Sequence, residues 1–186
     1  MQQVCDDVVK SATDGDVRAF EEIYRTYADY VFNLALRMLR RREDAEEVTQ
    51  EVFLMVHRSL KNFRGQSSLK TWIYRIAVNT TLNHLKRTKA VRTQTVEYDE
   101  EVHAYPGKDE AVSRDTKEYN ERVIDALLSE LTPDQRACIV LRNMDGLTYE
   151  EIAQALKIDI NAVRSRIKRA RLKLMAVKTE VLAYEM

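Results

Sequence analysis

The chain has 186 residues, and its 30 Lys or Arg balance 30 Asp or Glu, so the formal net charge is zero. Only 4 Gly and 2 Pro occur, too few turn residues for a sheet-rich fold, so we expect an all-α protein with one full-sized domain or two small ones. No run approaches the ~18 apolar residues of a membrane span, and no apolar signal segment opens the chain, so we expect no membrane insertion. Cys5 and Cys138 form no metal or redox motif, which favours a reduced, cytoplasmic protein.

The zero net charge divides into four blocks of alternating sign. Residues 1–51 carry net −5, residues 52–96 carry +9 without a single acid, residues 97–134 carry −8 and residues 135–186 carry +4. Two separate basic blocks predict two surfaces that meet a polyanion such as nucleic acid. A solvated basic face without a partner is the alternative.

Helical periodicity organises the first half of the chain. Apolar residues recur at helical spacing over residues 20–38, after the start signal Asp14-Gly15-Asp16. A second helix is predicted over residues 43–59, with an acidic stripe beside its inward face. Residues 63–68 read as a loop, and a third helix follows from about Leu69 towards Thr88.

The pattern is lost over residues 93–117, which are acidic and contain the break Pro106-Gly107. This composition is typical of a flexible interdomain linker. We therefore predict two small helical domains, residues 1–92 and 118–186. In the second, Pro133 is placed to open a helix that ends by Gly146.

A helix-turn-helix is predicted after Gly146. Thr148 and Glu151 form a capping-box pattern, the small Ala153 allows a close helix crossing, and Asp159 is placed to cap a second helix. Opposite the apolar stripe of that helix lies a polar, basic face that suits the major groove of DNA. The alternative is a basic amphipathic hairpin that packs on another protein.

The helix after Leu69 carries an unusual line of side chains. Trp72, Arg75, Asn79, Asn83 and Lys86 share a narrow sector beside its apolar stripe. An indole offers a stacking surface to unpaired bases, amides bond base edges and basic groups hold phosphates, so the line suits single-stranded or locally opened nucleic acid. A single Trp in a small domain is also a frequent core residue, and both roles stay open here.

Nothing in the sequence supports catalysis. Ser67-x-x-Lys70 lacks the other elements of an acyl-enzyme site, Glu100-x-x-His103 lies in the linker without a second copy, and the three His have no ligand-like spacing. We expect no catalytic residue, no metal ligand and no cofactor.

Two motifs in register then point to a family. Phe63-Arg64-Gly65 leads to the run KTWIYRIAVN at residues 70–79, and LTYEEIA follows at residues 147–153. Together they closely resemble the extracytoplasmic-function (ECF) sigma factors of the bacterial primary-sigma superfamily. The resemblance implies an alternative sigma factor, not an enzyme, that directs core RNA polymerase to a restricted set of promoters, as in a stress or envelope response. A stand-alone helix-turn-helix regulator and an inert helical interaction module are the other hypotheses.

The resemblance also implies partners and places. The first domain would dock on the coiled coil of the largest polymerase subunit and melt the −10 element, trapping a flipped base of the non-template strand. The second would read the duplex −35 element and meet the polymerase flap. The resemblance also implies an anti-sigma factor as a partner. It further implies that the protein is cytoplasmic and becomes associated with the nucleoid when it is part of the holoenzyme.

The predicted site residues fall into three sets. The docking set is Asp44, Glu47, Gln50 and Glu51. The −10 set is Phe63, Arg64, Gly65, Ser67, Ser68, Trp72, Arg75, Asn79, Thr80, Asn83, Lys86 and Arg87. The −35 set is Asn161, Arg164, Ser165, Arg166, Lys168, Arg169 and Arg171. Two positions depart from the family pattern: Lys157 stands where Gly is usual in the turn, and Asp159 where Ser is frequent.

Overall fold

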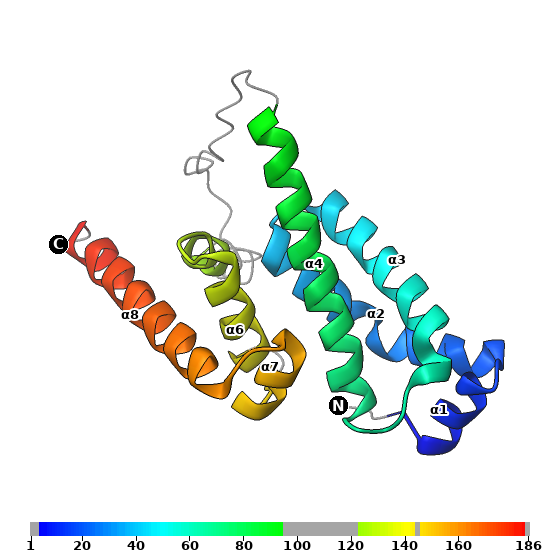
Figure 1. Cartoon of the computed structure of the whole chain (residues 1–186). Coiled ribbons are helices and arrows are strands. Elements are labelled where there is room, and N and C mark those ends of the chain that lie inside the picture. Colours follow the sequence, from blue (N-terminus) through cyan, green and yellow to red (C-terminus); the bar gives the residue numbers. More distant parts are fainter. Residues whose placement is uncertain (1–3, 95–122, 144–145, 185–186) are drawn as a thin grey trace, which may run out of the picture.

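A computed structural model of the chain describes residues 4–94, 123–143 and 146–184. Within these ranges the protein is all-α, without a strand, which confirms the predicted fold class (Figure 1). The first domain holds α1 (Asp6–Thr13), α2 (Val17–Leu39), α3 (Arg42–Ser59), the short 3-10 helix η1 (Leu60–Asn62) and α4 (Leu69–Gln94). The second holds a helical segment at residues 123–129, then α6 (Pro133–Asn143), α7 (Tyr149–Leu156) and α8 (Ile160–Tyr184).

Local signals start the long helices where the sequence predicts them. Asp16 caps α2, and its Oδ1 accepts hydrogen bonds from the backbone N–H of Arg18 at 2.8 Å and of Ala19 at 3.3 Å. Pro133 stands at the first position of α6, where its missing N–H costs nothing. Helix α4 runs on to Gln94, past the predicted end, and most of the predicted linker lies outside the described residues.

The helix-turn-helix is confirmed in detail. The Thr148 side chain and the Glu151 side chain form both halves of the capping box at the start of α7. Lys157 ends that helix in the left-handed region, with φ of 53°. Asp159 then caps α8, because its Oδ1 accepts from the Asn161 N–H at 2.7 Å. The inward face of α8 is buried as predicted, at Val163, Ile167 and Ala170.

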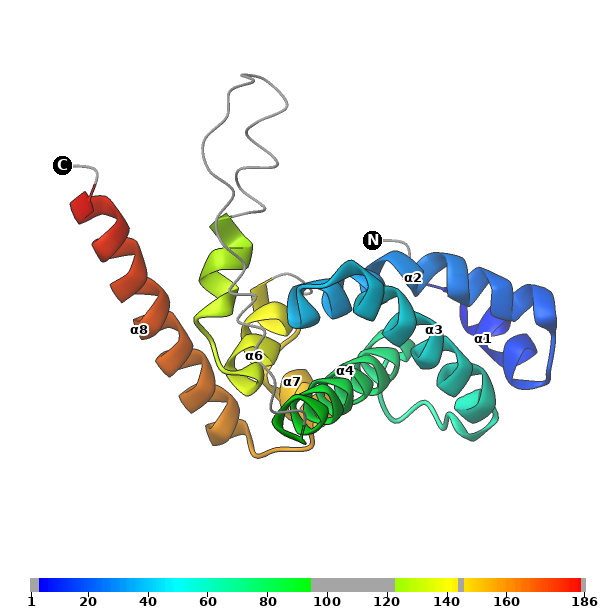
Figure 2. The same cartoon turned by 90° about the horizontal axis from the view of Figure 1, so that it is seen from above.

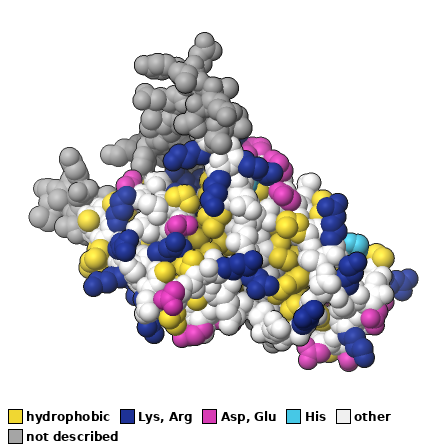
Figure 3. All heavy atoms as spheres, viewed as in Figure 1, with side chains coloured by type: hydrophobic (Ala, Val, Ile, Leu, Met, Phe, Trp, Pro, Cys, Tyr) yellow, Lys and Arg dark blue, Asp and Glu magenta, His cyan; other side chains and the backbone are white. Residues whose placement is uncertain are grey.

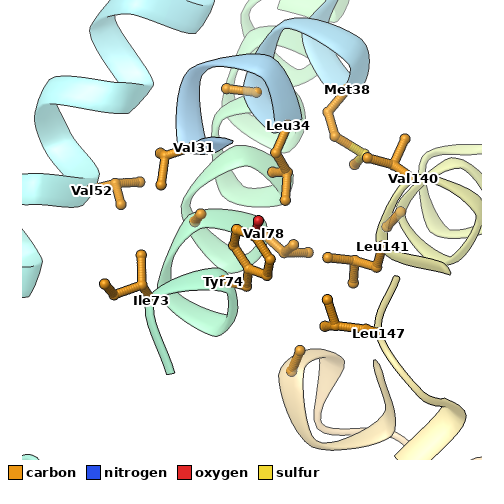
Figure 4. Close-up of a cluster of buried hydrophobic side chains, with 14 of the residues drawn as sticks. Val31, Leu34, Met38, Val52, Ile73, Tyr74, Val78, Val140, Leu141 and Leu147 are labelled. Carbon is orange, nitrogen blue, oxygen red and sulfur yellow. The ribbon is translucent and has the colours of Figure 1, made fainter. Parts of the chain in front are cut away.

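The two domains share one hydrophobic core. Figure 4 shows Leu141 and Leu147 of the second domain pointing towards Tyr74 and Val78 of α4, while Val140 approaches Met38 near the end of α2. All of these side chains are at most 2 % exposed. Burying such groups stabilises the contact between domains by about 1.5–3 kcal/mol for each large side chain.

A buried arginine joins the domains by hydrogen bonds. Arg136 of α6 donates to the backbone oxygen of Met38 in the first domain at 2.7 Å, and to those of Leu128 and Leu131 in its own domain. Because of this packing, α7 lies beside α4, and α8 lies at the outer edge, away from α2 and α3 (Figures 1 and 2). None of the described helices is both long enough and apolar enough to cross a membrane.

Candidate nucleic-acid and polymerase interfaces

A cavity of about 340 Å³ opens where the loop after η1 meets the start of α4. Trp72 is partly buried here, and its indole lies against the ring of Phe63, with centroids 5.2 Å apart and planes tilted by 53°. The indole therefore lines the cavity while one part of it packs on the core, so its core role is present and its contact with nucleic acid stays a prediction. The lining residues are Asn62, Phe63, Arg64, Gln66, Ser67, Thr71, Trp72, Arg75 and Gln154.

A second cavity of about 570 Å³ continues along α4, and Arg75 lines both. Its walls are Glu51, Met55, Arg75, Ile76, Asn79, Thr80, Asn83, Lys86, Arg87 and Lys157. Ten of the twelve residues of the predicted −10 set thus line one or both of two neighbouring cavities, and Gly65 and Ser68 line neither. The aromatic end can offer stacking surfaces, while the other end offers amides and basic groups.

Four members of the −10 set have roles within the fold. Ser68 caps α4, because its Oγ accepts from the Thr71 N–H at 3.1 Å. Gly65 has a φ of 67°, which a residue without Cβ adopts at little cost. Thr80 is only 5 % exposed, with its Oγ1 3.5 Å from the sulfur of Met55. The Asn79 amide donates to the Arg75 backbone oxygen at 2.7 Å.

The predicted acidic stripe of α3 divides into two kinds of side chain. Glu47 and Gln50 are exposed. Asp44 and Glu51 are partly buried and turn towards α4, where Glu51 pairs with Arg87 at 3.5 Å and Asp44 lies 3.8 Å from His84. A polymerase surface would contact Glu47 and Gln50 directly. It would contact Asp44 and Glu51 only after their contacts with His84 and Arg87 break.

The outer face of α8 carries most of the −35 set. Asn161, Arg164, Lys168, Arg169 and Arg171 are exposed, and Ser165 is partly buried. Hydrogen bonds along the helix order two of the guanidinium groups: Arg164 donates to Asn161 at 3.2 Å and Arg169 to Ser165 at 2.9 Å. This arrangement presents an amide and several cations from one side of a capped helix, as a major-groove reader requires.

Arg166 lies apart from that face. Its side chain is 29 % exposed and pairs with Asp134 at 3.1 Å, which directs it towards α6. On the face that Figure 3 shows, Lys and Arg side chains are spread over both domains with hydrophobic side chains among them, so on this face they form no continuous patch.

Helix α7 covers part of the α4 surface. Its Gln154 lines the first cavity and Lys157, directly after it, lines the second. The Thr71 hydroxyl also donates to Glu151 at 3.3 Å, a hydrogen bond between domains. The hydrogen bond from the Thr148 N–H is the main cause that lowers the pKa of Glu151, with Thr71 and Lys70 adding to it.

Several lining residues were absent from the sequence-based sets. Asn62, Gln66 and Thr71 lie in or beside the predicted loop, so the same motif could have included them. Gln154 and Lys157 come from the other domain. No local signal could have found these two, because their place depends on how the domains pack.

An all-helical, two-domain protein with a helix-turn-helix and an aromatic cavity on a basic helix belongs among DNA-binding proteins of transcription. Comparisons narrow that class. Residues 23–91 match Sigma-70 region 2, and residues 121–174 match Sigma-70, region 4. The RNA polymerase sigma-H factor of Pseudomonas aeruginosa is 34 % identical over 170 residues, which cover 88 % of each chain. The ECF RNA polymerase sigma-E factor of Escherichia coli is 34 % identical over 177 residues, 91 % of this chain and 92 % of that one.

The chain therefore belongs to the ECF family of RNA polymerase sigma factors, the non-enzymatic proteins that direct transcription initiation. Solved structures agree on the fold. CnrH in complex with the cytosolic domain of CnrY gives a TM-score of 0.69 at 22 % identity, covering 93 % of this chain and 96 % of that one. The sigma factor RpoE of Bartonella quintana, in complex with the anti-sigma factor NepR, gives 0.68 at 23 % identity, covering 88 % and 98 %.

Proposed function

We propose that this sigma factor divides its work between its two domains. Residues 1–92 dock on core polymerase and open the −10 element, residues 118–186 read the −35 element, and residues 93–117 link the two. The observation that carries this proposal is the cavity at Trp72, because an aromatic ring and polar side chains together on a basic helix suit unpaired bases. The chain itself has no enzymatic activity and works in the cytoplasm, where the polymerase is.

Docking uses the acidic side of α3. Glu47 and Gln50 are exposed and make the first contacts with a basic surface on the largest polymerase subunit. Asp44 and Glu51 join when their pairs with the same domain open. The Glu51–Arg87 pair is exposed and worth about 0–1 kcal/mol, so opening it costs little. Freeing Asp44 costs more, because its side chain is 22 % exposed and that of His84 only 10 %.

Melting uses the two cavities of α4. Flipping a base out of the duplex costs a few kcal/mol, and stacking on an aromatic side chain returns about 1–3 kcal/mol per base. Trp72 and Phe63 supply the stacking surface, and Arg75, Lys86 and Arg87 hold the phosphates of the displaced strand. Asn79 reaches a base edge only by giving up its bond to the Arg75 backbone.

The −35 element meets the outer face of α8. Asn161 and Arg164, near the helix start, are placed for base edges, and Lys168, Arg169 and Arg171 for phosphates. Replacing Lys168 by Ala should lower the salt slope of promoter binding by about one. Arg166 contributes indirectly, by tying α8 to α6 through Asp134.

Because Gln154 and Lys157 stand in the walls of the α4 cavities, the domains must separate before a single strand can lie along α4. An anti-sigma factor that holds the domains together would keep the protein inactive. Two of the structural neighbours support such a partner, since they were solved as complexes, one of them with a named anti-sigma factor.

Reconstituted transcription with core polymerase tests the proposal. Trp72→Ala should reduce promoter opening by about 5- to 150-fold, the range that corresponds to the lost stacking, while binding to core polymerase is kept. Trp72→Phe retains a ring and should recover part of the loss. Tyr30→Ala is a control, because Tyr30 is a partly buried aromatic residue on α2 that does not line the cavities.

Two results would contradict the proposal. Loss of both opening and polymerase binding in Trp72→Ala would mean that the indole acts only through the fold. Failure of the unmodified protein to stimulate any start site with core polymerase would favour a regulator that binds duplex DNA alone.

A further inference from the structure

Two side chains of α3 and one of α4 meet between these helices. Asp44 lies in the first turn of α3, Glu47 lies one turn later, and His84 comes from α4. One nitrogen or oxygen atom of each lies within 4.8 Å of the corresponding atoms of the other two. Asp44 is partly buried, Glu47 is exposed and His84 is only 8 % exposed.

The imidazole of His84 lacks the hydrogen bonds that a buried ring needs. Its Nδ1 is buried without a hydrogen-bond partner. Its Nε2 faces Asp44 Oδ1 at 3.8 Å, which is beyond hydrogen-bond distance. Buried polar groups without a partner are rare, and a cation would supply one at Nε2, the nitrogen that faces the carboxylate of Asp44.

The tautomers of the ring show what is missing. A neutral imidazole has one N–H and one lone pair. With the proton on Nε2, the ring faces Asp44 with an N–H group at a distance too long for a hydrogen bond. With the proton on Nδ1, the lone pair of Nε2 faces Asp44 Oδ1 at 3.8 Å, and an oxygen of Glu47 lies within 4.8 Å, so three acceptors stand close together. A cation between them turns the same geometry into attraction. The other oxygen of Asp44 is engaged elsewhere, with Arg41 Nε at 4.0 Å.

We propose that Asp44, Glu47 and His84 bind a divalent transition-metal cation of the Zn²⁺ class. One imidazole nitrogen with two carboxylate oxygens suits Zn²⁺, Co²⁺ or Ni²⁺, whereas Mg²⁺ and Ca²⁺ prefer oxygen ligands only. Three protein ligands leave a fourth position for water. Zn–N and Zn–O bonds of about 2.0–2.2 Å bring tetrahedral ligand atoms to about 3.4 Å from one another. The exposed Glu47 side chain can make most of that movement.

The site overlaps the proposed docking surface, and this part of the inference rests on the proposed function. A bound cation neutralises Asp44 and Glu47, two of the four acids and amides assigned to polymerase. Metal and polymerase then compete for the same carboxylates. His84 is not in the docking set, so a His84 variant removes one metal ligand and keeps both carboxylates. Because it also removes the neighbour of Asp44, its polymerase affinity is compared with and without Zn²⁺ in the same variant.

Metal binding is measured first, on the full-length chain after treatment with a chelator. Co²⁺ titration should give the visible absorption bands of a tetrahedral ion at one equivalent, and equilibrium dialysis with Zn²⁺ should give one bound ion per chain. His84→Gln should weaken both by at least tenfold, and so should Glu47→Gln, whose exposed side chain has no part in the core. His57→Gln makes the same change on the exposed side of α3 and should bind like the unmodified chain.

Less than one bound ion in the unmodified chain would overturn the site. Equal affinity in His84→Gln, or equal affinity in Glu47→Gln when His84→Gln fails to fold, would do the same. The competition is then measured as polymerase affinity with and without Zn²⁺. Zn²⁺ should lower the affinity of the unmodified chain and leave that of His84→Gln unchanged. Metal binding without any effect on polymerase would remove the docking role of Asp44 and Glu47 and keep the metal site.

Discussion

Arg136 is the residue on which the packing of the two domains depends most directly. It is 9 % exposed, and burial is the main cause that lowers the pKa of its guanidinium. Its three hydrogen bonds, of 2.7, 2.9 and 3.3 Å, all reach backbone oxygens near the ends of helical segments. Such oxygens lack the usual partner four residues on in the helix, and the helix dipole favours a cation beside them. Of the three, the Leu128 oxygen also accepts from the Leu131 N–H at 3.2 Å.

Replacing Arg136 by Met keeps an unbranched stem like that of Arg but removes the guanidinium group, and with it every one of these bonds. Each carbonyl left without a donor costs about 1–3 kcal/mol. Breaking a buried charged network typically costs 3–5 kcal/mol in total, a large share of the 5–15 kcal/mol of a whole fold. Arg136→Lys keeps the charge and loses the planar fork, so its cost should lie between those of the Met variant and the native residue.

Urea unfolding measures both the size of the loss and the coupling of the domains. Trp72 is the single Trp of the chain, so fluorescence follows the first domain while circular dichroism follows both. In the unmodified chain the two curves should coincide, and in Arg136→Met they should separate, because the bond to Met38 crosses between domains. Arg142→Met removes a hydrogen bond within the second domain, at 2.9 Å to Leu147, and should cost about 1 kcal/mol without separating the curves. A loss below 1 kcal/mol in Arg136→Met, with coincident curves, would refute this reasoning.

Three further predictions concern the second domain. The pKa of Glu151 is lowered by its hydrogen bond from Thr148, so its charge stabilises the fold above the unfolded value of about 4.3 and this contribution is lost as the pH falls. Glu151→Gln keeps the cap and should lose less stability in thermal melts between about pH 5 and pH 3; equal slopes would contradict the assignment. Burial raises the pKa of Cys138 to about 11, so a thiol reagent at about pH 8 should label Cys5 first and Cys138 at least a hundredfold more slowly. If Cys138 in a Cys5→Ser chain reacted about as fast as Cys5 does in the unmodified chain, this would be evidence against the raised pKa. Lys157→Gly should raise the free energy of unfolding in urea by up to about 1 kcal/mol, because φ is positive at this position, and Lys157→Ala should not. A higher free energy of unfolding in Lys157→Ala as well would point to an effect of the lysine side chain.

The start signals of helices could be read from the sequence because they are local. Asp16 and Thr148 each act on N–H groups two or three residues away, and their hydrogen bonds are those expected. Helix α1 was not predicted, because its 8 residues are too few for a clear apolar period. The contact between Arg136 and Met38 joins positions 98 apart, and no local pattern specifies it.

The same limit applies to charge. Counting Lys and Arg by position predicts basic surfaces, but it cannot tell which way each side chain points. Arg136 lies in the core and Arg166 is paired with Asp134, so neither faces a polyanion. The cavity at Trp72 was predictable in kind from one helical sector, whereas the part that α7 plays in it depended on the packing of the domains.

An ion pair between α3 and α4 joins an acidic and a basic charge block of the sequence, and this pair predicts a link between docking and melting. Glu51 of the acidic block and Arg87 of the basic block pair at 3.5 Å, with side chains 41 % and 63 % exposed. In the proposed roles, polymerase binds Glu51 and DNA binds Arg87. Binding of either partner opens the ion pair and leaves the other residue available for the second partner. An exposed pair is worth at most about 1 kcal/mol, or about fivefold in affinity. Glu51→Gln should therefore raise the affinity of the free chain for a single-stranded −10 oligonucleotide by up to about fivefold. The increase should disappear in an Arg87→Gln background, because the competing pair no longer exists there. An equal increase in both backgrounds would show that Glu51 acts only through long-range repulsion of the DNA.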